Sequence, residues 1–291
     1  MTEVGKAERG QTFRSVRGYL RGSYRSAVLV SIGLVYLTVL LGVSTRATAA
    51  GLACNANWPL CDGGLLNLFP ATMPSAFEWI HRVVAMFAGF AIVGTAALAY
   101  RDGASRRIMG VIAAGTLLLP IQIILGRATV MSFVPEVLAA HYWTAMAIYG
   151  LFVTAAVWAY SDAASFKHVR RALLGALVLL PAVVTLGPPV VSVYTAPIQA
   201  AQYAVLLPAF AALLFAGIVG WRLAPERSGF RALLAIGAGL LPVVVYLMRQ
   251  SIVQPPDSVF AVSYPVGILL LFAVVGGAAI QSYRTTPDLA A

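Results

Sequence analysis

The sequence predicts an all-α membrane protein whose eight transmembrane helices form two pseudo-symmetric four-helix bundles. Three observations predict this fold. Only 10% of the residues are charged and 60% are hydrophobic, whereas soluble domains carry roughly 25% charged residues. Apolar runs close to the roughly 20 residues that cross a bilayer recur along the whole chain. The second half also repeats the spacing of polar residues found in the first half.

The transmembrane spans follow one another with short polar connections. We expect them at 27–48, 77–100, 107–125, 136–160, 171–193, 197–221, 231–248 and 260–281. Pro120 with Gln122 interrupts the third span, and Pro242 interrupts the seventh. In a bundle, neighbouring helices can satisfy the backbone groups that a proline leaves free, so both spans are retained.

Basic residues alternate between successive loops. Sixteen of the 20 Lys and Arg residues fall on one side; the other side has only Arg46, Arg82, Arg127 and Arg249. The positive-inside rule therefore places both termini in the cytoplasm of a multi-pass cell-membrane protein. Because the basic residues are divided among several loops and form no single patch, they argue against a nucleic-acid surface, despite the net charge of +10. A cleaved secretory signal is the alternative for the first span, because Ala47-Thr48-Ala49 resembles a cleavage site.

The spans and loops together define the expected domains. These are a basic N-terminal segment at 1–26, a first bundle at 27–160, a cytoplasmic linker at 161–170, a second bundle at 171–281 and a tail at 282–291.

Two of the three histidines lie inside spans that run in the same direction. His81 and His141 fall at similar depths near the outer surface, in the second and fourth spans. An ionisable residue in a membrane span is a functional-site hypothesis by default. Two imidazoles on facing helices suit the axial ligation of haem iron. A hydrogen-bonded packing role is the alternative for each. His168, beside Lys167 and Arg170, is expected in a solvated loop.

Charged residues accompany these histidines. Glu78, His81 and Arg82 share one helix face at positions i, i+3 and i+4. Arg82, Arg127 and Arg46 suit the binding of haem propionates by charge-assisted hydrogen bonds. Glu78 is not needed for that task and suits proton transfer. A plain ion pair between Glu78 and Arg82 is the alternative.

Both cysteines of the chain fall in the loop between the first and second spans. Cys54 and Cys61 lie on the expected outer face, where a disulfide is permitted. A structural staple and a redox role both stay open. Zinc is disfavoured, because no histidine or third cysteine lies nearby in the sequence.

The second half repeats the scaffold and lacks the ligands. Arg127 precedes His141 by 14 residues, and Arg249 precedes Ser263 by 14. Gln202 stands in the position of His81, with Gln199 in that of Glu78. We therefore expect one haem site per chain, in the first bundle, and no second haem b.

Residues 27–160 resemble the haem A synthase family, particularly its archaeal branch. The resemblance depends on the loop string GLACNANWPLCDGG at 51–64, FEWIHR at 77–82, Leu125-Gly126-Arg127 and Ala140-His141. It implies an eight-helix oxidoreductase that converts a methyl group of haem O to the formyl group of haem A. It also implies that His81 and His141 flank the haem, that Glu78 is the essential acid, and that Cys54 and Cys61 can form the outer disulfide.

The resemblance further implies service to a haem-copper terminal oxidase. The expected partners are the haem substrate, the lipid bilayer, a haem O synthase, an electron acceptor and the oxidase, with self-association left open. The alternative function is a non-catalytic b-type cytochrome or haem carrier, which needs no Glu78. A haem-free assembly protein and a transporter fit the sequence less well.

Overall fold

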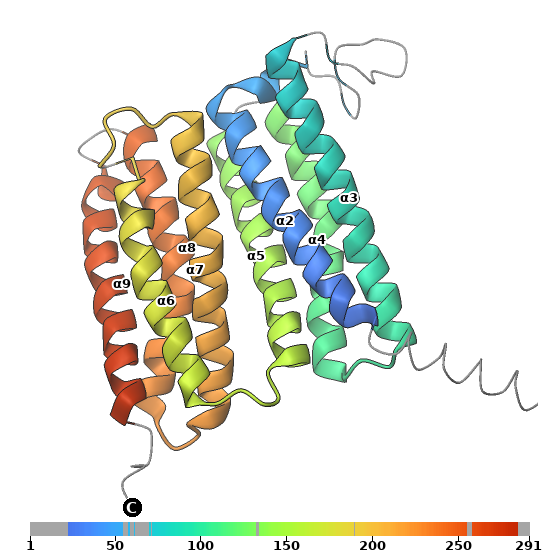
Figure 1. Ribbon diagram of the computed structural model, residues 1–291. Helices are drawn as coiled ribbons and strands as arrows, with labels where there is room; N and C mark the ends of the chain where they lie inside the picture. The colour runs from blue at the N-terminus through green and yellow to red at the C-terminus, as the bar shows by residue number, and fades with distance from the viewer. Residues whose placement is uncertain are drawn as a thin grey trace, which may run out of the picture.

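The structure is a computed structural model that describes residues 23–54, 58, 61, 70, 72–131, 134–188, 190–254 and 258–284. The basic segment up to residue 22 and the tail from 285 lie outside these residues. The described part forms eight helices long and apolar enough to cross a membrane, which confirms the expected fold class (Figure 1). They are α2 (Ser23–Ala47), α3 (Met73–Arg101), α4 (Arg106–Met131), α5 (Pro135–Tyr160), α6 (Phe166–Thr185), α7 (Ala196–Leu223), α8 (Ser228–Val253) and α9 (Val259–Arg284). A short 3₁₀ turn, η1 (Ala50–Leu52), follows α2.

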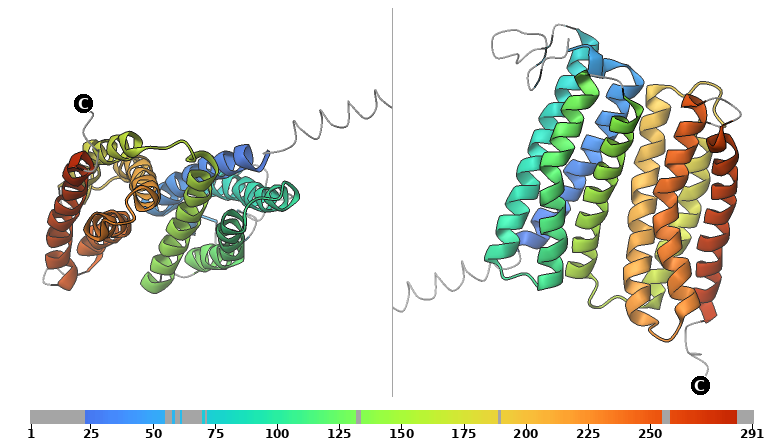
Figure 2. Two further views of the ribbon diagram at one scale, coloured as in Figure 1. Left: turned by 90° about the horizontal axis from the view of Figure 1, so that it is seen from below. Right: turned by 180° about the vertical axis from the view of Figure 1, so that it is seen from behind.

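The helices form two groups of four that stand side by side (Figure 2). In the first bundle, α2 packs on α3, α3 on α4, α4 on α5, and α5 on α2. In the second bundle, α6, α7, α8 and α9 follow the same cyclic order. Helices α3 and α5 therefore occupy opposite corners, as do α2 and α4. The bundles meet where α7 packs against α2 and α5.

The fifth span differs from the expected 171–193, because α6 begins at Phe166 and ends at Thr185. At its start, the Ser165 N–H donates a hydrogen bond to Nδ1 of His168 over 3.2 Å, as in a capping box. His168 is exposed to solvent, as expected, but it lies in the first turn of α6 and not in a loop. At the other end, Gly187 and Pro188 follow the helix, and proline disfavours helical geometry in the residue before it.

Tyrosines of the first bundle donate hydrogen bonds to backbone carbonyl groups of the second. The hydroxyl of Tyr36 donates to the carbonyl of Ala204 over 3.2 Å. That carbonyl has lost its usual helical donor, because Pro208 stands four residues later and has no N–H. Tyr149 donates to the carbonyl of Leu207 over 3.2 Å, and Tyr142 to that of Pro242 over 2.8 Å. A neighbouring helix thus satisfies a backbone group that a proline leaves free.

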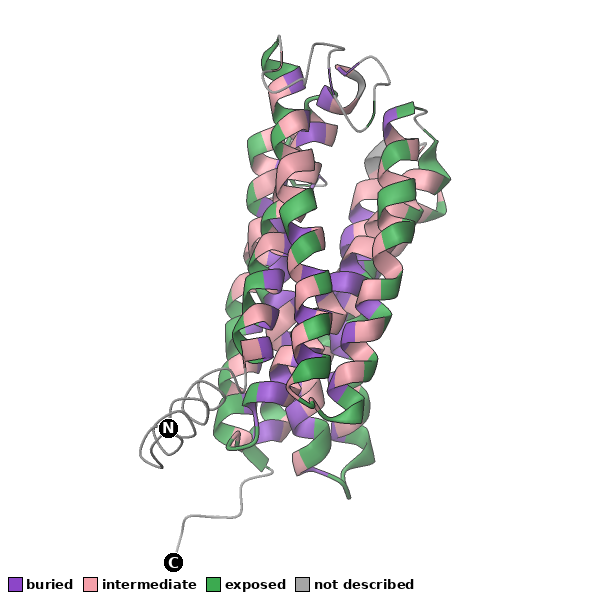
Figure 3. Cartoon of the chain, turned by 90° about the vertical axis from the view of Figure 1, so that its right-hand side faces the viewer, coloured by how far each residue is buried: buried purple, intermediate pink, exposed green. Residues whose placement is uncertain are grey.

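Burial separates the interior of the bundles from the faces that would meet lipid (Figure 3). Large apolar side chains such as Leu117 and Leu269 are exposed on the outer faces. Glu78, only 4% exposed, is the one buried charged residue within the described spans. A buried carboxyl group in a membrane span needs a specific partner, and its surroundings therefore indicate where a functional site lies.

Candidate functional site

His81 projects from α3 toward α2. A Cβ atom added to Gly42 would lie only 2.9 Å from His81 Cε1, so the imidazole lies against the backbone of α2. The backbone of Thr38, one turn earlier in α2, also lies near the imidazole. Its Nδ1 atom is buried and has no hydrogen-bond partner. The absence of a side chain at Gly42 is what leaves room for the ring.

His141 repeats this arrangement on the opposite corner of the bundle. It projects from α5 toward α4, and a Cβ atom on Gly126 would lie 3.3 Å from its Cε1 atom. Its Nε2 atom lies 3.4 Å from Nε2 of Gln122. Its Nδ1 atom, like that of His81, is buried without a partner. The two imidazoles are close enough for His81 to contribute to the electrostatic potential at His141.

These features fit an axially ligated haem. A buried polar atom normally has a partner, and a buried imidazole nitrogen without one is available to a ligand. Haem iron takes its four equatorial bonds from the porphyrin, so the protein needs to supply only the axial ligands. The described residues contain no group of three or more His, Cys, Asp or Glu side chains of the kind that holds a bare metal ion. Two imidazole nitrogens can supply the axial ligands that a haem needs from the protein.

Glu78 lies one turn before His81 on α3. Arg82 Nε donates a hydrogen bond to Glu78 Oε1 over 2.9 Å, so the ion pair weighed as an alternative is present. On the other side, a Cβ atom on Gly51 of η1 would lie 3.9 Å from Glu78 Oε2. The carboxylate is thus enclosed between its own helix and the turn that follows α2.

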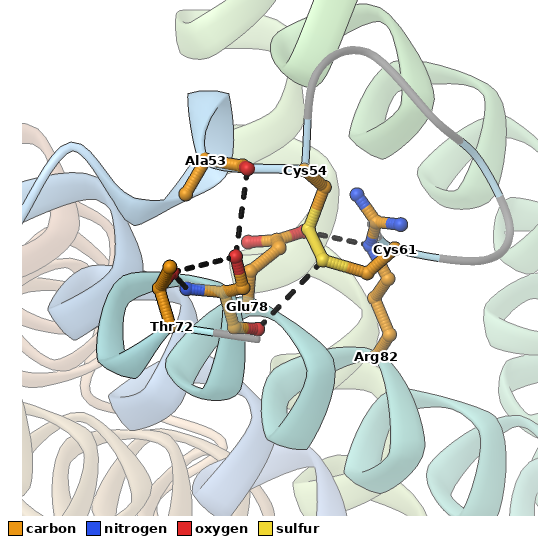
Figure 4. The surroundings of a disulfide bond; sticks show 7 residues. Ala53, Cys54, Cys61, Thr72, Glu78 and Arg82 are labelled. Atoms are coloured by element: carbon orange, nitrogen blue, oxygen red, sulfur yellow. Dashed lines mark hydrogen bonds and ion pairs between the residues drawn. A yellow bond between two sulfur atoms is a disulfide. The ribbon is translucent and has the colours of Figure 1, made fainter. Parts of the chain in front are cut away.

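A disulfide joins Cys54 and Cys61 in the loop between α2 and α3, as the resemblance implied (Figure 4). The Sγ atom of Cys61 lies 3.9 Å from the carbonyl oxygen of Ser75, in the first turn of α3. The Ser75 hydroxyl donates to the carbonyl of Ala53 over 3.5 Å, and the Ser75 N–H donates to the Thr72 hydroxyl over 3.3 Å. The disulfide is therefore held against the start of α3, beside Glu78 and Arg82.

The three arginines expected to bind propionates have different surroundings. Arg82 pairs with Glu78, and the guanidinium of Arg127 lies 5.9 Å from the centroid of the Trp58 ring. Arg46 lies at the boundary between the bundles, within electrostatic reach of Arg249 and Tyr203. Arg82 and Arg127 thus lie near the loop between α2 and α3, whereas Arg46 faces the second bundle. Their binding of propionates stays a prediction.

The residues that replace the histidines in the second bundle are engaged with protein groups. Gln202 is 1% exposed, and its Nε2 atom donates to the carbonyl of Val183 over 2.8 Å. The Ser263 hydroxyl donates to the carbonyl of Val259 in its own helix over 2.7 Å.

Sequence reasoning missed the glycines and the backbone that hold the two histidines. Gly126 stood in the quoted string Leu125-Gly126-Arg127, but nothing in that string shows that it faces His141. No sequence pattern connected Gly42 or Thr38 with His81, because only the packing of α2 on α3 brings them together. Trp58 was visible in the loop string, yet its contact with Arg127 depends on the folded loop.

Comparison with known proteins gives a family for part of the chain. Residues 70–200 match the family model described as cytochrome oxidase assembly protein, COX15-CtaA. The matched segment is less than half of the chain. It contains Glu78, His81, Arg82, Arg127 and His141. The family implies haem binding in a multi-pass membrane protein, consistent with the eight helices.

Individual relatives carry two kinds of name. A protoheme IX farnesyltransferase of Haloarcula marismortui is 38% identical over 124 residues, 43% of this chain and 26% of that protein. A heme A synthase of Alkalihalophilus pseudofirmus is 29% identical over 138 residues, 47% of this chain and 46% of that protein. A heme A synthase of Rhodospirillum centenum is 30% identical over 145 residues, 45% of this chain and 38% of that protein. Each match spans less than half of the relative. No solved structure matches the chain.

Proposed function

We propose that the chain is a haem A synthase-like membrane oxidoreductase that converts the methyl group of haem O to the formyl group of haem A for a haem-copper terminal oxidase. One observation carries the proposal: two half-buried histidines, each with a buried and unpartnered Nδ1 atom, stand on opposite corners of one bundle, and a buried glutamate lies one turn before His81. The family match over residues 70–200 adds to it.

The substrate haem lies between His81 and His141 in this proposal. Glycines at 42 and 126 let α2 and α4 approach the imidazoles closely, which restricts where the two rings can move. Arg127 and Arg82 bind the propionates by charge-assisted hydrogen bonds, and Arg46 contributes from the boundary with the second bundle. Eight apolar helices keep the reacting edge away from bulk water.

Glu78 handles protons. In the overall reaction, one water supplies the oxygen of the formyl group. Four electrons leave the methyl carbon, and four protons are released, two from that carbon and two from the water. Glu78 is the only buried acid within the described spans and can accept a proton beside the haem. Arg82 holds the carboxylate in place through the 2.9 Å hydrogen bond and stabilises its charge between turnovers. The electrons pass to an acceptor outside the chain.

The farnesyltransferase names of other relatives suggest a different reaction, the transfer of a prenyl group. Prenyl diphosphates are usually held through magnesium and several carboxylates. The described residues contain no cluster of three or more acidic or metal-binding side chains. Those relatives therefore support a haem substrate and a haem O synthase as partner better than they support prenyl transfer by this chain.

One observation favours a second candidate, a non-catalytic b-type cytochrome or haem carrier. The ion pair with Arg82 gives Glu78 a structural partner, so its burial does not by itself require catalysis. The two candidates differ in the pigment that they hold, because a cytochrome or carrier keeps haem b and a synthase contains haem O and haem A.

The deciding experiment is extraction and identification of haem from the purified membrane protein. His81→Ala and His141→Ala are expected to lose most of the pigment. His168→Ala is the matched control, because this third histidine lies in the first turn of α6, away from the site. Haem O with haem A supports the synthase, and haem b alone supports the cytochrome. A protein without Soret absorption would remove both. Both termini are proposed to be cytoplasmic, which places the disulfide and Glu78 at the outer surface.

A further inference from the structure

The first bundle has glycine on the two corners that flank its histidines. Gly42 lies on α2 and Gly126 on α4, which are opposite corners of the bundle. Cβ atoms there would lie 2.9 Å and 3.3 Å from the Cε1 atoms of His81 and His141. No side chain therefore extends from these two positions toward the space between the imidazoles.

The second bundle has one glycine and one methionine at the matching places. Met248 precedes Ser263 by 15 residues, just as Gly126 precedes His141 by 15. Gly187 follows α6 and lies against Gln202, since a Cβ atom on it would be 2.9 Å from Gln202 Nε2. Gly187 thus matches Gly42, which lies in the same way against His81.

Met248 fills the centre of the second bundle. Its side chain is 0% exposed, and a Cβ atom on Gly187 would collide with its Cε atom. Because α6 and α8 stand on opposite corners, a contact from Met248 to Gly187 crosses the middle of the bundle. The corresponding space in the first bundle lies between His81 and His141.

Hydrogen bonds hold the side chain of Gln202, which also lies against Gly187. The hydroxyl of Tyr194 donates to Gln202 Oε1, and Gln202 Nε2 donates to the carbonyl of Val183 over 2.8 Å. Burial raises the pKa of Tyr194, so its hydroxyl keeps the proton that it donates. Both polar atoms of the Gln202 amide are thereby engaged, and neither is available to a ligand.

We propose that Met248 is the residue that closes the second bundle to a porphyrin, and that glycine at the matching position 126 keeps the first bundle open. The proposal rests on the proposed haem site at His81 and His141. The Cβ atom of a methionine at 126 would lie 3.3 Å from His141 Cε1, so its side chain would enter the space beside that imidazole. Its side chain would then occupy the place of the porphyrin. The ligand residues alone do not decide how many haems the chain holds.

The first test closes the open bundle. Gly126→Met is expected to lower the haem content per polypeptide at least tenfold, measured by absorbance of the pyridine haemochrome against protein concentration. Gly110→Met is the matched control, because Gly110 lies in the same helix and a Cβ atom there meets nothing within 4 Å. The control is expected to keep the wild-type haem content. A folded Gly126→Met protein with that same content would overturn the proposal.

The second test opens the closed bundle and does not depend on whether Gly126→Met folds. A double variant, Gln202→His with Ser263→His, is expected to hold the same single haem as the wild type. Adding Met248→Gly is expected to raise the content to two haems per chain. Two haems in the double variant, or one haem in the folded triple variant, would overturn the role of Met248. Wild-type protein that binds no haem would instead overturn the proposed function, so the two failures are distinguishable.

Discussion

Arg82 and Glu78 form a hydrogen-bonded ion pair one helical turn apart on α3, with 2.9 Å between Nε and Oε1. The pair lies beneath the disulfide loop and one turn from His81. Since Glu78 is 4% exposed, Arg82 rather than water stabilises its charge. Proton uptake by Glu78 therefore requires this hydrogen bond to weaken, which makes Arg82 a positioning residue for the carboxyl group.

Glu78→Gln is expected to keep the haem spectrum and to slow haem A formation at least about 100-fold, the effect of losing a general base. The measurement is conversion of haem O to haem A followed by chromatography of the extracted pigments. Glu136→Gln is the matched control, because Glu136 lies exposed in the first turn of α5. Wild-type conversion by the Glu78 variant would remove this residue from the mechanism.

Arg127→Gln is expected to weaken haem binding about tenfold, since a hydrogen bond to a charged group contributes about 1.5 kcal/mol. Haem retention during titration with a competing apoprotein measures this change. Arg249→Gln is the control, because Arg249 holds the same position in the bundle without histidines. Equal losses in both variants would argue against a propionate contact specific to Arg127.

Tyr36→Phe is expected to destabilise the protein by about 1 to 3 kcal/mol, because it leaves the Ala204 carbonyl without a donor. Tyr149→Phe removes a similar hydroxyl from the carbonyl of Leu207. The residue four positions after Leu207 is Ala211, which has a backbone N–H to donate, so a smaller loss is expected. Thermal unfolding in detergent compares the two. A larger loss in the Tyr149 variant would contradict the role assigned to Pro208.

Replacing Cys54 and Cys61 together by serine is expected to destabilise the outer end of the first bundle by about 2 kcal/mol, the value for a short closed loop. Proteolysis of the outer loop in membranes of known orientation measures the change. Wild-type protein treated with a reductant is the control, and it should show the same increase in cleavage. Unchanged cleavage in both would show that the disulfide does not order the loop.

Asp102 makes stability depend on pH at the other end of the bundle. Burial raises the pKa of Asp102, but hydrogen bonds from Arg101, Ser23 and the backbone of Tyr24 outweigh it, and the net shift is downward. A carboxyl whose folded pKa is lowered stabilises the fold above its unfolded pKa of about 3.9 and loses this effect as the pH falls through the folded pKa. Asp102→Asn should therefore lower the Tm at pH 7 and lower it by a smaller amount near pH 3. An equal drop at both pH values would contradict this linkage.

The structure adds details to the site that the sequence did not contain. His81, His141 and Glu78 were visible because ionisable residues are rare in apolar spans. The glycines at 42 and 126 were not, since a glycine in a helix carries no sign of which side chain faces it. The span expected at 171–193 was wrong at both ends, because hydropathy continues past Thr185 and only Gly187 and Pro188 end the helix.

By itself, the amino-acid sequence determined that the chain crosses the membrane, that it has eight spans, and where its ionisable residues lie along them. These properties follow from apolar length and from the spacing of residues, which are local. Tertiary structure alone decided which helices stand on opposite corners of a bundle. It also decided that Tyr36 donates to the carbonyl that Pro208 leaves without a donor, and that the Met248 side chain contacts Gly187. Such relationships depend on packing between segments distant in sequence, because the neighbours of a helix are defined only once the chain has folded.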